Sequence, residues 1–394
     1  MTTLVVSDIF PPKTGGSGRW LWEVYRRLPR EDYLIAAGED PRQGDFDGPH
    51  DLRVARVPLR LDSWGLASLG GLRGYARSIG ALRRLAVRER VGMVHCGRCL
   101  PEGVMALALK AWSGVPFACY VHGEDVTTAR DSRELSWLVR RALLSAEFLV
   151  ANSRNTERIL LDEWAVPAGR VRVLHPGVDT ARFVPAPRDP DARRRLGWGD
   201  RPVVLTVGRL QKRKGHDHLI RALHAVRRAI PDVLYAVVGD GEERGSLQAL
   251  AAREGLGEHV QFAGEVADEE LIRRYQQCDL FALPNREVGR DIEGFGMVLL
   301  EAQACGKPVI AGASGGTAET MDIPATGRVV DCGTPDDLAA LVAELLADRD
   351  RLRAMGEAAR AWACARFDWG ELARQAGEVF DRGAPPRAGR PVPA

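Results

Sequence analysis

Two carboxylates suited to ligand binding stand in the stretch DIEGFGMVLLEAQACG, residues 291–306. All the residues between Glu293 and Glu301 are glycine or apolar, which predicts a helix near 295–305. A carboxylate before a helix meets unpaired backbone N–H groups and the positive end of the helix dipole. Glu301, close to the same helix face and about two turns deeper, is costly to bury without polar partners. We therefore expect Glu301 to bind the two hydroxyls of a ribose, with an activated sugar near Glu293.

A cluster of cations follows a predicted strand at 203–210 and precedes a predicted helix near 215–230. Its members, in GRLQKRKGHDHL, are Arg209, Lys212, Arg213 and Lys214. Positive charge beside a helix N-terminus is unfavourable, and a bound anion would offset it. The cluster indicates a diphosphate site, and the alternative is a solvated basic loop.

A glycine-rich loop follows the first predicted strand in SDIFPPKTGGSGRW, residues 7–20. Gly15, Gly16 and Gly18 precede an amphipathic helix, so backbone N–H groups there can approach an anion closely. The spacing matches neither the dinucleotide-binding fingerprint nor a P-loop. An anion cradle and a plain strand-to-helix loop both remain open.

Polar residues end the apolar run CYVHGEDV, residues 119–126. His122, Glu124 and Asp125 would lie at the carboxyl end of a strand, which is the ligand-binding edge of a doubly wound sheet. We expect His122 to serve the site, and the alternative is a buried structural histidine. Cys96 and Cys99 form a lone Cys-x-x-Cys without the second pair that a zinc site normally needs, so no metal is expected.

Length and composition indicate an ordinary globular protein. At 394 residues the chain suits two domains, and its net charge of +2 gives no reason to expect nucleic acid as a partner. Seven cysteines scattered along the chain predict reduced thiols and a cytoplasmic location. The start MTTLVVSDIF shows no signal peptide, and no segment approaches the length of a membrane span.

Short apolar runs alternate with helical patterns along the chain, which is typical of parallel sheets covered by helices on both faces. The Pro- and Arg-rich stretch 179–202 interrupts this alternation and is interpreted as a linker and the lead-in to a second domain. The predicted fold is α/β, with two doubly wound, Rossmann-like domains facing across a cleft. The predicted domains are 1–185 and 186–368, and 383–394 forms a disordered tail.

Five motifs in order resemble the retaining, GT-B fold glycosyltransferases, the family of sucrose synthases and bacterial mannosyltransferases. The motifs are PPKTGG, HGED, HPGVDTARF, GRLQKRKG and the Glu-x7-Glu of EGFGMVLLE. The run 291–320 looks especially like the phosphatidylinositol mannosyltransferase branch. RFDWGELARQ resembles the family's C-terminal segment, which returns to the N-terminal domain, so helix 369–382 is expected to complete that domain.

The resemblance implies a role for each site residue. Arg209 and Lys214 neutralise the donor diphosphate, His122 contacts the donor sugar near the reacting carbon, and Glu293 contacts the sugar hydroxyls. These four are the expected catalytic residues. The resemblance also implies donor contacts from backbone groups and from the ribose-binding carboxylate, at Gly15, Gly16, Gly294, Phe295, Gly296, Met297 and Glu301.

The implied reaction moves a hexose from a nucleotide-diphosphate sugar to a hydroxyl of a lipid, glycan or small molecule, with retention and without a metal or cofactor. GDP-mannose is the favoured donor, and UDP-glucose and UDP-N-acetylglucosamine stay open. Glu124 stands where the branch usually has another histidine, which leaves the acceptor open. Other hypotheses are a nucleotide-sugar epimerase on the same fold and a nucleotide-binding oxidoreductase, but the oxidoreductase fingerprint is missing.

A basic amphipathic helix is predicted over 71–91. Its arginines accompany an apolar stripe at Leu72, Ala76, Ile79, Leu82 and Leu85. Such a helix either lies on an anionic membrane surface, making the protein peripheral at the inner membrane face, or packs its stripe on the sheet.

Overall fold

The computed structural model describes residues 2–13 and 15–383 and divides into two compact units. The first unit runs to Pro176 and resumes at Trp369, so the C-terminal helix belongs to it. The second unit spans Gly177–Asp368 and begins before the expected boundary at 186. The earlier start has a physical reason, because Val178 and Phe183 are buried in the core of the second unit. The expected tail beyond Gly383 lies outside the described residues.

The first unit is built on a parallel sheet, which within the described residues has seven strands in the order β3-β2-β1-β4-β5-β6-β7. Every residue of the strand YLIAAG is buried, as expected for a sheet covered on both faces. The strands are β1 (Thr2–Ser7), β2 (Tyr33–Gly38), β3 (Val54–Val57), β4 (Val91–Cys96), β5 (Phe117–Val121), β6 (Leu149–Ala151) and β7 (Val171–Val173).

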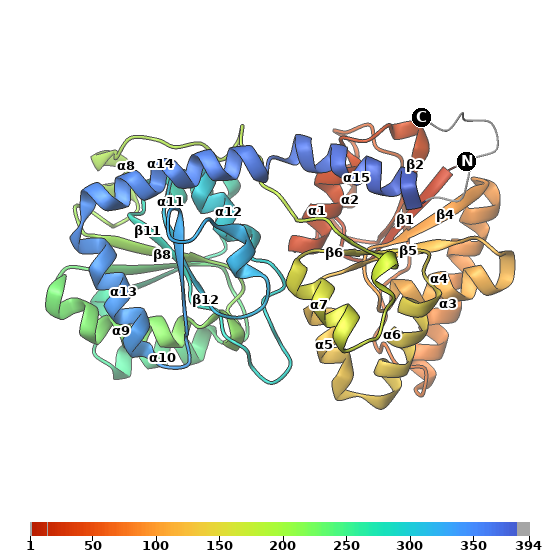
Figure 1. The fold of residues 1–394 in the computed structure, drawn as a ribbon, viewed down its shortest axis with the longest axis horizontal. Coiled ribbons are helices and arrows are strands. Elements are labelled where there is room, and N and C mark those ends of the chain that lie inside the picture. The colour runs from red at the N-terminus through yellow and green to blue at the C-terminus, as the bar shows by residue number, and fades with distance from the viewer. Residues whose placement is uncertain (1, 14, 384–394) are drawn as a thin grey trace. The chain divides into compact units, whose positions relative to one another are not determined.

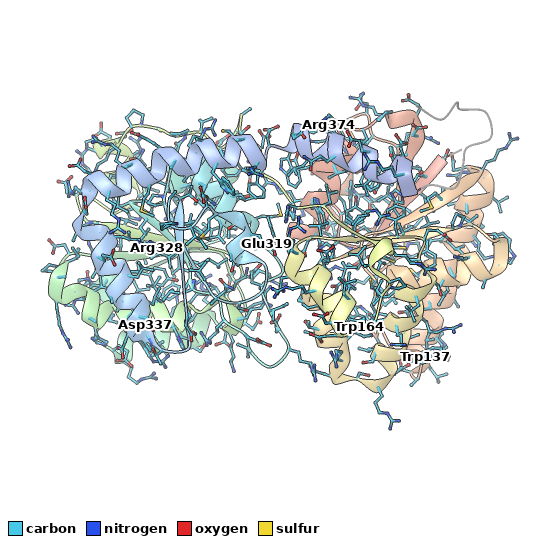
Figure 2. The ribbon with its side chains drawn as sticks, in the orientation of Figure 1. Trp137, Trp164, Glu319, Arg328, Asp337 and Arg374 are labelled. Atoms are coloured by element: carbon cyan, nitrogen blue, oxygen red, sulfur yellow. The ribbon has the colours of Figure 1, made fainter. Side chains whose placement is uncertain are left out.

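Helices cover both faces of this sheet (Figure 1). On one face α1 packs against α15, and on the other α4 packs between α3 and α6. Trp164, which follows α7, is buried in the core on the second face (Figure 2). The helices are α1 (Gly16–Tyr25), α2 (Gln43–Asp47), α3 (Leu69–Arg88), α4 (Glu102–Ser113), α5 (Glu124–Thr127), α6 (Arg133–Ser145), α7 (Arg154–Asp162) and α15 (Trp369–Gly383), with 3-10 helices at Arg30–Asp32, Thr128–Asp131 and Ala168–Arg170.

The second unit repeats this architecture with a parallel sheet whose described strands run β10-β9-β8-β11-β12-β13. One core lies under α9, α10 and α13, and another lies under α8, α11 and α12. The strands are β8 (Val203–Val207), β9 (Leu234–Val238), β10 (Val260–Gly264), β11 (Leu280–Leu283), β12 (Val309–Gly312) and β13 (Gly327–Val330). The helices are α8 (Pro190–Arg195), α9 (His216–Ala229), α10 (Arg244–Arg253), α11 (Asp268–Gln277), α12 (Met297–Ala304), α13 (Pro335–Ala347) and α14 (Arg349–Arg366), with 3-10 helices at Lys212–Lys214, Gly257–His259 and Thr317–Thr320.

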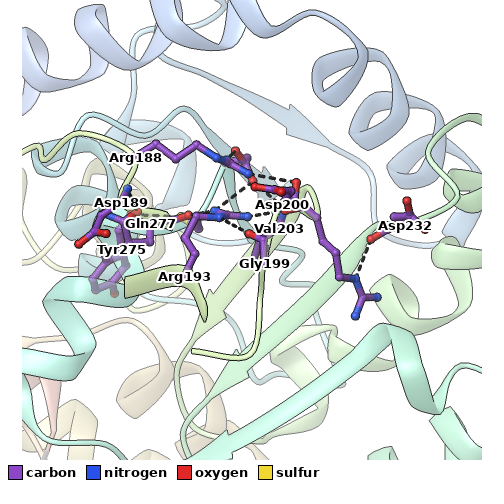
Figure 3. A network of polar contacts seen from close by, with 12 residues as sticks. Arg188, Asp189, Arg193, Gly199, Asp200, Val203, Asp232, Tyr275 and Gln277 are labelled. Atoms are coloured by element: carbon purple, nitrogen blue, oxygen red, sulfur yellow. Dashed lines mark hydrogen bonds and ion pairs between the residues drawn. The ribbon is translucent and has the colours of Figure 1, made fainter. Parts of the chain in front are cut away.

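The stretch 179–202 is not the linker that its composition suggested. It contains α8, which Asp189 caps by accepting hydrogen bonds from two backbone N–H groups. The Arg193 side chain is fully buried and donates to the carbonyls of Gly199, Gln277 and Arg201 (Figure 3). The charge of Arg193 is thereby satisfied inside the protein, and the segment packs as part of the second unit.

Helix α3 packs on the core through part of the predicted stripe, because Leu82 and Leu85 are buried and Ile79 packs against the same core. Its buried side includes Tyr75, Ser78 and Leu82, and the Ser78 hydroxyl donates to the Pro58 carbonyl over 2.6 Å. Leu72 of the predicted stripe is instead 48% exposed. The predicted stripe therefore holds for the second half of the helix, whereas Tyr75 and Ser78 take the buried positions near its start. Within residues 2–13 and 15–383, no helix is long and apolar enough to cross a membrane.

Candidate functional site

The loop after β8 carries the expected cations, and the structure gives them different surroundings. Arg209 is exposed, whereas Lys214 is only 8% exposed at the end of the 3-10 helix Lys212–Lys214. Gly215 follows with φ +73°, and a Cβ there would stand 1.8 Å from the Pro284 carbonyl oxygen. Glycine is therefore required at this position, where the loop meets the end of β11.

Glu293 is the centre of an ionic cluster. Lys214 Nζ lies 2.5 Å from its Oε2 atom, and Arg213 contacts the same oxygen and also pairs with Asp291 over 3.1 Å. Burial raises the pKa of Glu293, but the Lys214 and Arg213 charges outweigh burial and the net shift is downward. The Asp291 and Glu293 carboxylates thus neutralise Arg213 and Lys214, two of the four cations. From the sequence, this neutralisation was expected from a bound anion alone.

A glycine loop after β12 holds the Glu293 backbone in place. Gly316 N donates to the Glu293 carbonyl over 3.0 Å. Gly315 has φ +67°, and a Cβ there would stand 1.8 Å from the same carbonyl oxygen. The Asn285 side chain ties this loop to β11, because it accepts from Gly312 N and donates to the Ser314 carbonyl. These contacts fix the backbone from which the Glu293 side chain extends.

The residues Gly294, Phe295, Gly296 and Met297 form the entry to α12. Gly296 precedes the helix with φ +89°, and Met297 is the first helical residue. Phe295 is buried and packs against Phe367 at 6.0 Å between ring centroids. The helix starts only at Met297, so Glu293 precedes it, as expected, but the two-turn helical spacing expected between Glu293 and Glu301 does not apply.

Glu301 lies on α12 and is 6% exposed. Tyr275 of α11 donates its hydroxyl hydrogen to Oε2 of Glu301 over 2.8 Å. This hydrogen bond within the protein offsets part of the cost of burying the Glu301 carboxylate, in addition to any bond from a ribose. This partner was missed because a tyrosine in a predicted helix gives no signal of what it faces.

The glycine loop of the first unit ends at the start of α1. Gly15 and Gly16 are exposed, as a backbone anion cradle requires. Gly18 is buried, and a Cβ there would stand 2.3 Å from the Ile9 carbonyl oxygen. Lys13 pairs with Asp8 over 2.8 Å and holds the loop against the end of β1.

His122 follows β5 and is 5% exposed. Its Nε2 atom lies 2.7 Å from the Gly97 carbonyl, which can only accept, so Nε2 carries the hydrogen and Nδ1 is the acceptor. Burial lowers the pKa of His122, as does the nearby Arg98, while Asp125 opposes the shift. Asp125 also accepts from the His122 backbone N–H over 3.0 Å, so the residue is held from both sides as a neutral imidazole.

Each unit has one further feature of interest. Asp217 of α9 forms a two-pronged ion pair with Arg286, whose backbone N–H donates to the Arg213 carbonyl.

A cavity of about 270 Å³ lies beyond β2 and β3 and is lined by Glu39, Pro58, Leu59, Arg60, Asp62 and Arg77. Among the described residues, no group of three or more His, Cys, Asp or Glu side chains could hold a metal ion.

Comparison with known families covers both units. Residues 14–182 match the family described as Glycosyltransferase Family 4, and residues 189–362 match Glycosyl transferases group 1. A GDP-mannose-dependent alpha-(1-6)-phosphatidylinositol monomannoside mannosyltransferase of Mycolicibacterium smegmatis is 36% identical, with 93% of this chain and 94% of the relative covered. A D-inositol 3-phosphate glycosyltransferase of Salinispora arenicola is 33% identical over 95% of this chain and 89% of the relative.

Solved structures agree on the fold. Anabaena Alr3699/HepE in complex with UDP-glucose has a TM-score of 0.81 at 24% identity, covering 97% of this chain and 100% of that one. Sucrose-phosphate synthase from Thermosynechococcus elongatus has a TM-score of 0.80 at 24% identity, with 97% and 99% covered. With family matches in both units and relatives similar over nearly its whole length, the chain belongs to the group 1 glycosyl transferases and is a hexosyltransferase of the GT-B fold.

Proposed function

We propose that the chain transfers mannose from GDP-mannose to a phosphatidylinositol-based glycolipid, with retention of configuration and without a metal ion. The observation that carries the proposal is the ionic cluster of Arg213 and Lys214 with Glu293 at the entry to α12. The choice of donor and acceptor is supported by the M. smegmatis relative, a GDP-mannose-dependent mannosyltransferase acting on phosphatidylinositol monomannoside.

In this reaction the donor's bond between the sugar carbon and the phosphate oxygen breaks while the acceptor oxygen bonds the same carbon. The leaving phosphate takes the acceptor proton. Arg209 and Lys214 stabilise the charge that grows on the diphosphate, which is the main work of such a site. His122 offers Nδ1 to a donor hydroxyl, Glu293 binds sugar hydroxyls, and Glu301 binds the ribose. Backbone N–H groups at Gly15, Gly16 and Gly294–Met297 complete the donor site.

The acceptor is proposed to bind through its phosphate at the cavity beyond β2 and β3. Arg60 and Arg77 line this cavity together with Glu39 and Asp62, so both phosphate and hydroxyl groups find partners. Arg60→Ala should raise the KM for the lipid acceptor about tenfold while donor hydrolysis without acceptor stays unchanged. An unchanged acceptor KM would place the acceptor elsewhere.

Helix α3 is proposed to contact an anionic membrane surface. Its exposed side carries Arg83, Arg84 and Arg88, and Val87 is 65% exposed among them. The Arg83 guanidinium stacks on the exposed Trp112 ring at 4.0 Å, at a surface cavity of about 500 Å³. Cations beside exposed apolar groups suit a lipid interface. The double variant Arg83→Glu/Arg84→Glu should no longer sediment with phosphatidylglycerol vesicles, whereas Arg228→Glu on α9 should; equal sedimentation of both would refute the surface.

The reaction is tested by incubating the chain with GDP-mannose, UDP-glucose or UDP-N-acetylglucosamine, with and without phosphatidylinositol monomannoside. We expect acceptor-dependent release of GDP, unaffected by EDTA, and a product whose new linkage is α by NMR. A free sugar nucleotide of altered configuration would indicate an epimerase instead. Faster turnover of a UDP-sugar, an inverted linkage or loss of activity in EDTA would each correct the corresponding part of the proposal.

A further inference from the structure

His216 is a buried residue directly behind the cation loop. It is the first residue of α9, separated from Lys214 only by Gly215, and is 1% exposed. Its Nδ1 atom lies 2.8 Å from the Tyr235 hydroxyl, which donates to Thr206 Oγ1 over 3.1 Å. Thr206 in turn donates to the Ala282 carbonyl. Because Tyr235, Thr206 and Ala282 lie on the neighbouring strands β9, β8 and β11, this chain of hydrogen bonds crosses three strands beneath the loop.

The chain of hydrogen bonds runs in one direction. A carbonyl can only accept, so Thr206 donates to Ala282, Tyr235 donates to Thr206, and His216 must donate from Nδ1. The Nδ1 hydrogen of His216 is therefore committed to Tyr235, and the Nε2 atom is buried.

The surroundings keep this imidazole neutral. Burial and the nearby Lys214 charge lower the pKa of His216 to about 4, against weaker opposition from the Arg209 carbonyl and Asp217. At neutral pH the ring thus carries one hydrogen, on the nitrogen that bonds Tyr235. The imidazole is fixed in both orientation and protonation while it sits beside a residue of the donor site.

We propose that His216 is a positioning residue for sugar transfer: its hydrogen-bonded chain to three strands fixes the loop that carries Lys214, and thereby the place of the Lys214 ammonium. The inference rests on the proposed role of Lys214 at the donor diphosphate. Gly215 cannot absorb a shift of the loop, since it already abuts the Pro284 carbonyl. A displacement at His216 is therefore passed to Lys214, and displacements of about 1 Å can cost on the order of 100-fold in rate.

Three variants test this role. Tyr235→Phe removes one oxygen from the chain, His216→Leu removes both ring nitrogens, and His216→Asn keeps a donor near the position of Nδ1. We expect Tyr235→Phe and His216→Leu to lower kcat at least about tenfold with the donor KM changed less than about threefold, since a misplaced stabiliser acts mainly in the transition state. His216→Asn should recover most of the rate. His224→Asn, an exposed site on the same helix, is the matched control.

Thermal melts accompany the kinetics and separate the two possible roles. Wild-type kcat in His216→Leu with a lowered Tm would overturn the inference, because the residue would then only stabilise the fold. If His216→Leu does not fold, wild-type kcat in Tyr235→Phe would overturn it equally. The donor is the sugar nucleotide that the wild-type chain turns over fastest, so a wrong donor assignment shows in the wild type, whereas failure of the positioning role shows only in the variants.

Discussion

Lys214 Nζ lies 2.5 Å from Glu293 Oε2, so the cation expected at the donor phosphates and the carboxylate expected at the donor sugar form one ionic unit. Arg213 contacts the same carboxylate oxygen. A charge network of this kind is preorganised, since each side chain is held before any substrate binds. Removing one member therefore changes the place of the others as well as its own contact with substrate.

Lys214→Ala and Arg209→Ala should each lower turnover on the order of 100-fold or more, because each removes a charge that stabilises the leaving diphosphate. The fold should survive both changes, since Arg213 still pairs with Glu293 after the loss of Lys214. Lys212→Ala, an exposed cation of the same 3-10 helix, is the control and should keep near-normal turnover. Initial rates with saturating donor give the comparison; near-normal rates in either test variant would remove that residue from the diphosphate site.

Glu301→Gln should weaken binding of the nucleoside diphosphate by about 1.5–3 kcal/mol, the contribution of a hydrogen bond to a charged group. The amide oxygen can still accept from Tyr275, so the Tm should change little. Tyr275→Phe is the reverse case: it removes the protein partner, and should lower the Tm while leaving nucleotide affinity unchanged. Calorimetric titration with the nucleoside diphosphate and a thermal melt on both variants distinguish ribose binding from a structural role. A lowered Tm with unchanged nucleotide affinity in Glu301→Gln would mean that Glu301 only stabilises the fold.

Gly315→Ala should lower turnover at least about tenfold, because the new Cβ would meet the Glu293 carbonyl and displace the carboxylate from its cations. Gly289→Ala is the matched control. Gly289 also has a positive φ, of +61°, but nothing lies within 4 Å of its added Cβ. Both variants carry the backbone strain of alanine in this region, so only the clash distinguishes them. Equal losses of turnover in the two would mean that strain, and not the position of Glu293, sets the rate.

Stability should fall as the pH is lowered from 7.5 to 5. Burial lowers the pKa of His95 to about 3 from its ordinary 6.5, so the unfolded chain binds a proton there before the folded protein does. The contribution of the neutral His95 ring to the free energy of unfolding is complete above about pH 6.5 and is lost progressively as the pH falls toward 3. At pH 5 the loss amounts to about 2 kcal/mol. Urea unfolding of His95→Gln should show a loss smaller by about that amount, whereas exposed His224→Gln should follow the wild type. A wild-type slope in His95→Gln would contradict this assignment.

The alternation of short apolar runs was enough to predict both sheets, because parallel strands are buried on both faces and β-branched residues mark them. The helix predicted near 215–230 is α9, whose bounds in the structure are His216–Ala229. The stretch 179–202 was misjudged as a linker because its composition gave no periodic pattern, while Arg193 is buried against two nearby carbonyls and that of the distant Gln277.

The candidate site was predictable in its residue types but not in its pairings. Sequence spacing indicated Lys214 and Glu293 separately, and no local rule could show that distant loops bring them together. Asn285 and Gly315 were missed for the same reason, since they act by holding backbone that belongs to another loop. His216 gave no signal because a histidine at a helix start is ordinary until its partners on three strands are known.

The division of the chain after Pro176 and before Trp369 has a consequence for biosynthesis. A ribosome making this protein synthesises all of the second unit, Gly177–Asp368, before it adds α15, which completes the first unit by packing against α1. The sheet of the first unit is translated earliest, yet the part of one face that α15 covers stays open until the end of translation. The first unit therefore cannot reach its final structure until the last described helix of the chain has been made.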